Sequence, residues 1–154
     1  MNKSRDKQKL LISRCLLGDK VRFDGRDCLI EEKKRLERAF ELIPICPEMM
    51  AGLGVPRQPI EYRQGQLVTK QGKDITTQFE PVLLEIERLI RQQQISYAVL
   101  KEDSPSCGVS RLYDGHFSGN LIVGKGHTTK FLISHGISVF SEHDIGSLLA
   151  MITE

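Results

Sequence analysis

No segment of this chain has the length or the unbroken apolar character that a membrane-spanning helix requires. A basic N-terminus precedes an apolar run that begins at Leu10, but Ser13 and Arg14 interrupt that run at once, so no signal peptide is predicted. Both absences favour a cytoplasmic protein without a membrane partner. Disulfides rarely persist in that compartment, so the four cysteines are expected to be free thiols, metal ligands or catalytic groups.

A strong net charge is also lacking. The 22 Lys and Arg residues and 20 Asp and Glu residues leave a net charge of +2, which is too small to indicate a nucleic-acid-binding surface. Lys33, Lys34 and Arg35 are interpreted as a solvated helix face. No Pro/Gly/Ser-rich linker divides the 154 residues, which suffice for one buried core. We expect one domain over residues 1–154, with residues 1–8 flexible.

Short apolar runs alternate with segments of helical periodicity. The expected strands are residues 9–14, 42–45, 96–100 and 137–140, and the expected helices are residues 29–42, 77–94, 127–135 and 143–152. Residues 60–69 are expected to be extended, and the Gly- and Pro-rich segment 46–59 is interpreted as too irregular for a helix of any length. Strands that alternate with helices imply βαβ units and a mostly parallel sheet. The predicted fold is a Rossmann-like, three-layer α/β domain.

Three of the four cysteines lie just beyond an apolar run that we expect to be a strand. These three are Cys15, Cys46 and Cys107. Ligands of open α/β sheets bind outside the carboxyl ends of the strands, so the three thiols are predicted to share one site there. A cysteine that serves only as a small apolar side chain is expected inside a strand instead. Cys28 begins a charged helix, and because nothing in the sequence directs it to the same edge we interpret it as a bystander.

The ligand type and spacing narrow the choice of metal. Thiolates favour zinc, copper(I) or iron–sulfur clusters. The chain has no CxxC pair and no ligand spacing among its four histidines, whereas structural zinc sites usually show such spacing. Widely separated single cysteines suit a bulkier cluster. A cubane iron–sulfur cluster normally takes four thiolates, so three would leave one iron open as a Lewis acid.

Polar residues near these cysteines are candidates for acid–base chemistry. Glu48 lies two residues beyond the second cysteine and is a candidate general acid or base, or else an exposed loop carboxylate. Ser104 and Ser106 precede the third cysteine, and they are candidates for a proton relay or for hydrogen bonds to cluster sulfur, or else turn residues. Lys101 and Glu102 are expected to form an ordinary ion pair.

Several segments together resemble one known family. The segments ISRCLLGDKVRFDG, PICPEMMAGLGVPRQPIE, GKDIT, VLKEDSPSCG and YDGHFSGNLIVGKG, with GISVFSE near the end, are similar to those of the DUF523 family, whose characterised members are thiouracil desulfurases (desulfidases). The resemblance runs from about Leu11 to Glu142. The combination of CPE…GL…PR with KE.SPSCG is highly specific.

This resemblance implies a cofactor and a set of site residues. The cofactor is an oxygen-sensitive [4Fe-4S] cluster that Cys15, Cys46 and Cys107 ligate, so that the fourth iron binds the sulfur of the substrate. Family members of this type remove sulfur from 2-thiouracil and give uracil and hydrogen sulfide. Their acid–base residues map onto Glu48 and Ser104.

The function that the sequence predicts is a non-redox, iron–sulfur-dependent desulfurase of a thiolated nucleobase or nucleoside. Ser13, Ser106 and Arg57 are the candidates for substrate binding. Arg14 replaces the alanine that is commoner before Cys15 in the family, a change that alters the charge of the pocket and thereby substrate choice. The alternatives are a sulfur carrier or donor and a non-catalytic metal-binding or sensing protein. We expect a monomer or a small homo-oligomer.

Overall fold

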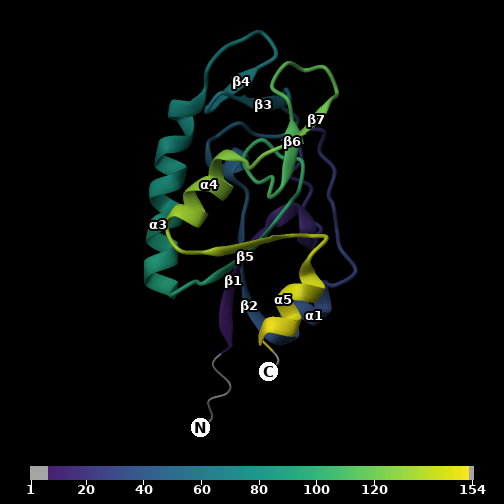
Figure 1. Cartoon of the computed structure of the whole chain (residues 1–154), viewed down its shortest axis with the longest axis vertical. Coiled ribbons are helices and arrows are strands. Elements are labelled where there is room, and N and C mark those ends of the chain that lie inside the picture. The colour runs from purple at the N-terminus through teal and green to yellow at the C-terminus, as the bar shows by residue number, and fades with distance from the viewer. Residues whose placement is uncertain (1–6, 153–154) are drawn as a thin grey trace.

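A parallel sheet with helices on both faces forms the centre of the molecule (Figure 1). The computed structural model describes residues 7–152, in which the sheet has the strand order β2-β1-β5-β8 and every neighbouring pair is parallel. The strands are β1 (Gln8–Ser13), β2 (Phe40–Ile45), β5 (Tyr97–Leu100) and β8 (Ser138–Ser141). The predicted three-layer α/β fold with a mostly parallel sheet is confirmed.

From Leu10 onward the inner strand β1 is buried on both of its faces, which explains the unbroken apolar run Leu10–Ile12. Leu10 and Ile12 pack in the cluster that includes side chains of two helices, α1 (Lys33–Ala39) and α5 (Ile145–Ile152). Leu11 points to the opposite face and packs in the cluster that includes α3 (Glu80–Gln93) and α4 (His127–Ser134). The alternation of side chains along a strand thus joins the three layers.

Two antiparallel hairpins lie beyond the carboxyl ends of the sheet strands, in the upper part of Figure 1. The first is β3 (Ile60–Arg63) with β4 (Gln66–Thr69), within the segment predicted to be extended. The second is β6 (Arg111–Tyr113) with β7 (Leu121–Val123), which the sequence analysis missed. A third apolar cluster joins both hairpins to the 3-10 turn Thr76–Phe79 before α3, so this region has its own small core.

The helix predicted over residues 29–42 is wrong at both ends, because α1 covers only residues 33–39. Before α1, the amide of Cys28 donates to the carbonyl oxygen of Cys15 at 2.8 Å, which ties this segment to another part of the chain. After α1, Phe40 pairs with Gln8 as the first residue of β2. Tertiary backbone contacts therefore shorten the helix.

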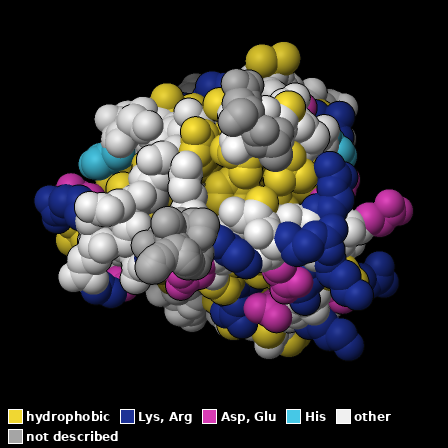
Figure 2. Space-filling view, turned by 90° about the horizontal axis from the view of Figure 1, so that it is seen from below, with side chains coloured by type: hydrophobic (Ala, Val, Ile, Leu, Met, Phe, Trp, Pro, Cys, Tyr) yellow, Lys and Arg dark blue, Asp and Glu magenta, His cyan; other side chains and the backbone are white. Residues whose placement is uncertain are grey.

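The end of the molecule at which the strands begin shows an apolar area beside many Lys and Arg side chains (Figure 2). Lys34 and Arg35 of α1 are exposed, as expected of a solvated helix face. Of the segment 1–8 that we expected to be flexible, residues 1–6 lie outside the described residues, and Gln8 is the first residue of β1. Within residues 7–152, no helix has both the length and the apolarity that crossing a membrane demands.

Candidate functional site

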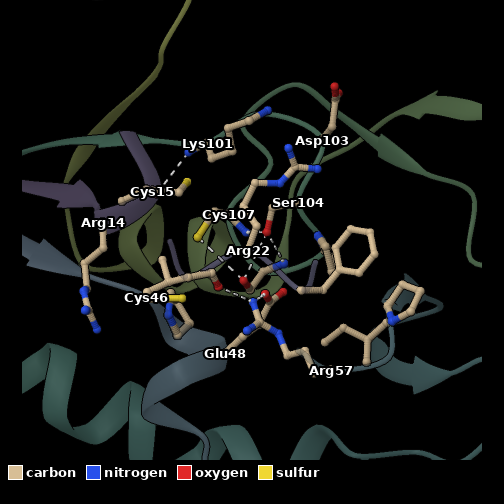
Figure 3. A pocket seen from close by; sticks show the side chains of 18 of the residues that line it. Arg14, Cys15, Arg22, Cys46, Glu48, Arg57, Lys101, Asp103, Ser104 and Cys107 are labelled. Carbon is tan, nitrogen blue, oxygen red and sulfur yellow. Dashed lines mark hydrogen bonds and ion pairs between the residues drawn. The ribbon is translucent and has the colours of Figure 1, made fainter. Parts of the chain in front are cut away.

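Cys15, Cys46 and Cys107 line one pocket at the carboxyl ends of β1, β2 and β5. Figure 3 shows the three sulfur atoms directed into this pocket, whose volume is about 400 Å³. A water molecule takes about 30 Å³ of liquid, so the pocket has room for a group much larger than one ion. All three thiols are free. Within residues 7–152, no three His, Cys, Asp or Glu side chains form a group that would hold a single metal ion.

Burial makes these thiols hard to ionise without a bound cation. Burial raises the pKa of Cys107 to about 12, although a hydrogen bond from Ser106 lowers it in part. Burial likewise raises the pKa of Cys15, and the charges of the other three cysteines raise it further. A metal centre removes this cost because it binds the thiolate form. The donor set therefore fits a polynuclear iron–sulfur centre, which thiolates hold.

One turn of helix, α2 (Pro47–Met50), follows Cys46 directly, so the expectation of no helix within 46–59 is wrong. Proline suits the first turn of a helix because its missing N–H would have no partner there. The turn brings Glu48 to the pocket (Figure 3). Burial is the main cause of the raised pKa of Cys46 and Cys107, and the charge of Glu48 raises both further.

Arg57 holds the Glu48 carboxylate in position. Its Nη2 donates to Oε1 of Glu48 at 2.6 Å, and the side chains of Arg57 and Glu48 are only 6% and 15% exposed. The same guanidinium donates to the carbonyl oxygens of Gly54 at 2.7 Å and Val21 at 2.8 Å. Because protein groups already occupy these donors, the contacts of Arg57 favour positioning of Glu48 over the substrate binding predicted from the sequence.

The hydroxyl groups of three serines converge near Cys107. Ser104 Oγ accepts hydrogen bonds from the amides of Ser106 at 3.2 Å and Cys107 at 3.1 Å, so its own hydrogen is left to donate. Ser106 Oγ lies 3.3 Å from Ser104 Oγ and 3.6 Å from the sulfur of Cys107. Ser13 Oγ accepts from the amide of Lys101 at 3.0 Å, and its hydrogen bond to Cys107 opposes the effect of burial on that thiol's pKa.

Lys101 and Glu102 do not form the expected ion pair. Lys101 Nζ instead lies 3.1 Å from a carboxylate oxygen of Glu142. The buried Glu102 carboxylate accepts hydrogen bonds from three consecutive amides, those of residues 109–111, at 2.6–3.2 Å and from the Ser110 hydroxyl at 2.8 Å. Burial opposes ionisation of Glu102, but these hydrogen bonds outweigh it and lower the pKa. Glu102 thereby closes the loop that carries Cys107.

Glycine at position 126 lets the start of α4 pack directly on the backbone of that loop. The amide of Thr128 donates to the carbonyl oxygen of Ser106 at 2.7 Å. A Cβ atom at Gly126 would lie 2.6 Å from the carbonyl carbon of Ser106 and 2.9 Å from the amide nitrogen of Cys107. Such contacts with backbone atoms leave no room for any other residue.

Gly126→Ala is therefore expected to lower the free energy of unfolding by about 1–3 kcal/mol, as overpacking does. It should also speed alkylation of Cys107 in the cluster-free chain, because the loop must move. Denaturant unfolding and mass-spectrometric thiol labelling measure both effects. The matched control is Gly146→Ala in α5, where, among residues 7–152, no atom beyond the adjacent residues and the backbone of that helix lies within 4 Å of the added Cβ, and where alanine should stabilise by up to about 1 kcal/mol. Equal stability of the Gly126 variant and the wild type would contradict the packing argument.

Cys28 is not remote from this edge of the sheet, so the expectation that nothing directs it there is wrong. Its amide donates a hydrogen bond to the carbonyl oxygen of Cys15, and both side chains belong to the same apolar cluster. Cys28 nevertheless does not line the pocket. The contact arises because the loop after β1 returns past Cys15, a path that residue spacing does not reveal.

Arg14 lines the pocket, but its charge is paired. Its Nε lies 3.0 Å from Oδ2 of Asp19, and both side chains are substantially exposed. Figure 3 shows the guanidinium directed away from the sulfur atoms. Asp19 thus offsets much of the change in pocket charge that we expected from Arg14.

These features define an α/β protein with a thiol-lined pocket at the carboxyl edge of a parallel sheet. The chain belongs to the 2-thiouracil desulfurase family, whose model matches residues 10–144. It is 31% identical over 150 residues to the uncharacterized protein YbbK of Bacillus subtilis (strain 168). This match covers 91% of this chain and 99% of YbbK. Its structure resembles that of the [4Fe-4S]-dependent thiouracil desulfidase TudS (DUF523Vcz), with a TM-score of 0.89, 38% identity, and coverage of 96% of this chain and 99% of that one. The resemblance stated from the sequence motifs is confirmed.

Proposed function

We propose that this protein is an enzyme that removes sulfur from a thiolated pyrimidine such as 2-thiouracil and releases uracil and hydrogen sulfide. The observation that carries the proposal is the convergence of three free thiols and the Glu48 carboxylate on a single pocket. Family membership supports the reaction, and the similar structure named as a [4Fe-4S]-dependent thiouracil desulfidase supports the cofactor. Cys15, Cys46 and Cys107 would hold the cluster.

The cluster and the protein supply different parts of the chemistry. When bound through three cysteines, a [4Fe-4S] cluster supplies an open iron that acts as a Lewis acid toward the sulfur of the substrate. The reaction consumes one water, because C=S becomes C=O and the sulfur leaves as hydrogen sulfide. No electrons are gained or lost in this balance, so the proposed reaction is a hydrolysis.

Glu48 is the proposed general base. Arg57 binds its Oε1, which leaves Oε2 to accept a proton from the attacking water. Ser104 is the proposed donor toward the pyrimidine ring, since two amides already fill its acceptor positions. Ser106 and Ser13 are proposed to hold Cys107 through their hydroxyl groups rather than to bind substrate.

The deciding experiment is anaerobic purification followed by iron and sulfide assays and a 2-thiouracil absorbance assay. We expect about four irons and about four acid-labile sulfides per chain, with release of uracil and hydrogen sulfide. One zinc without sulfide would indicate a non-catalytic metal-binding protein. Sulfur transfer to an acceptor without hydrolysis of thiouracil would indicate a sulfur carrier. A cytoplasmic location and a monomeric or small homo-oligomeric state stay predictions, which fractionation and light scattering would test.

A further inference from the structure

A fourth thiol of the chain lies next to one of the three thiols that line the pocket. The amide of Cys28 donates to the carbonyl oxygen of Cys15 at 2.8 Å. A backbone hydrogen bond holds the two residues next to each other, and the Cα atoms of hydrogen-bonded pairs in an antiparallel sheet are about 5.5 Å apart. A disulfide bridges Cα atoms that are about 4.4–6.8 Å apart. The backbone geometry therefore suits a bond between these two residues.

The two side chains also pack in the same part of the core. Both belong to one apolar cluster. The sulfur of Cys28 also accepts a hydrogen bond from Nη1 of Arg22, which lines the pocket, at 3.7 Å.

We propose that Cys15 and Cys28 form a disulfide when a peroxide reaches the cluster-free chain, and that this reversible bond protects the cluster site from further oxidation. Hydrogen peroxide oxidises the half-buried Cys28: its O–O bond breaks, one water leaves and a sulfenic acid forms. The sulfur of Cys15 then displaces the hydroxyl group, the S–S bond forms and a second water leaves. Two thiols are oxidised and one peroxide is reduced to two waters, so no further reactant is needed.

This disulfide would preserve the ability of the chain to rebuild the cluster. A lone thiol that meets excess peroxide proceeds to sulfinic acid, which ordinary thiol reductants do not reverse. A disulfide stops this sequence, and a dithiol reductant restores both thiols. Cys28 is free for this task because it does not line the pocket. In the loaded enzyme Cys15 would be engaged by the cluster, so the disulfide should form only after the cluster is lost.

Peptide mapping tests the pair. The cluster-free chain would be treated with one equivalent of hydrogen peroxide, alkylated, and digested with trypsin without reduction. Trypsin separates the two cysteines because it cuts at Arg14 and Lys20 around one and at Arg26 and Lys33 around the other. We expect peptides 15–20 and 27–33 to be linked with the loss of two hydrogen atoms. The loaded chain treated in the same way should give little of this product.

The control variant is Cys28→Ser, with its fold checked by thermal unfolding. When this variant is treated with an excess of hydrogen peroxide, two equivalents should oxidise Cys15 to sulfinic acid, and iron reloading after reduction should fall several-fold below that of the wild type treated in the same way. A dominant link from Cys15 to Cys46 or Cys107, or full alkylation of Cys28 after peroxide, would overturn the proposal. The inference rests on the proposed function only in treating Cys15 as a cluster ligand. Mapping in the cluster-free chain needs no substrate, so a failed desulfurase assay would leave its result interpretable.

Discussion

Replacement of Cys15, Cys46 or Cys107 by alanine is expected to abolish iron binding and 2-thiouracil desulfuration together. Each residue supplies one of only three thiols that line the pocket, so each loss leaves an incomplete ligand set. Loss of a residue that only supports a metal ligand typically costs about 10–100-fold, and loss of a ligand should cost more than about 100-fold. Iron and sulfide content, visible absorbance and turnover after anaerobic purification measure the effect.

Cys28→Ala is the matched control because it removes the same group from a thiol that does not line the pocket. We expect iron content and anaerobic turnover near those of the wild type. If the Cys46→Ala variant kept both its iron and its turnover, that result would contradict the ligand assignment. Loss of iron in all four variants would instead show that the substitutions act through general instability.

Glu48→Gln is expected to keep the cluster and to lose about 10²–10⁴-fold in turnover, the usual contribution of a general base. Glutamine has the same shape and can still accept the hydrogen bond from Arg57, so the pocket should keep its form. It cannot take a proton from water. Iron content and the rate of thiouracil loss measure the two properties separately, and a change in kcat with little change in KM is the expected pattern.

A suitable control for this prediction is Glu85→Gln on α3. That carboxylate pairs with Arg88 on the exposed face of the helix and does not line the pocket. The Glu85 variant should match the wild type in iron and turnover. Wild-type turnover in the Glu48 variant would remove this residue from the mechanism and would leave Ser104 as the leading candidate for proton transfer.

The convergence of the cysteines could be predicted because parallel strands end at one edge of a sheet. Each thiol follows an apolar run, and the register of β1 with both neighbours brings the three strand ends together. Glu48 could be found for the same reason, since it follows Cys46 so closely. The β6–β7 hairpin was missed because its strands are short and lie in a glycine-rich stretch without a clear period.

The partners of the charged groups could not be predicted. The Glu102 carboxylate accepts hydrogen bonds from amides seven to nine residues further along the chain, and Lys101 pairs with Glu142, forty-one residues away. Neither contact follows from neighbouring positions in the chain. Arg57 was a candidate for substrate binding until its contacts with Glu48 and two carbonyl oxygens were known.

The amino-acid order alone was sufficient for the layered fold, the family and the identity of the pocket cysteines, because apolar periodicity and strand-end position are local properties. The three-dimensional arrangement was needed to show that Arg57 supports Glu48, that Glu102 closes the Cys107 loop and that Cys28 lies against Cys15. These relations depend on the path of irregular loops. Such paths follow from packing and from satisfying buried polar groups over the whole chain, which no short stretch of sequence specifies.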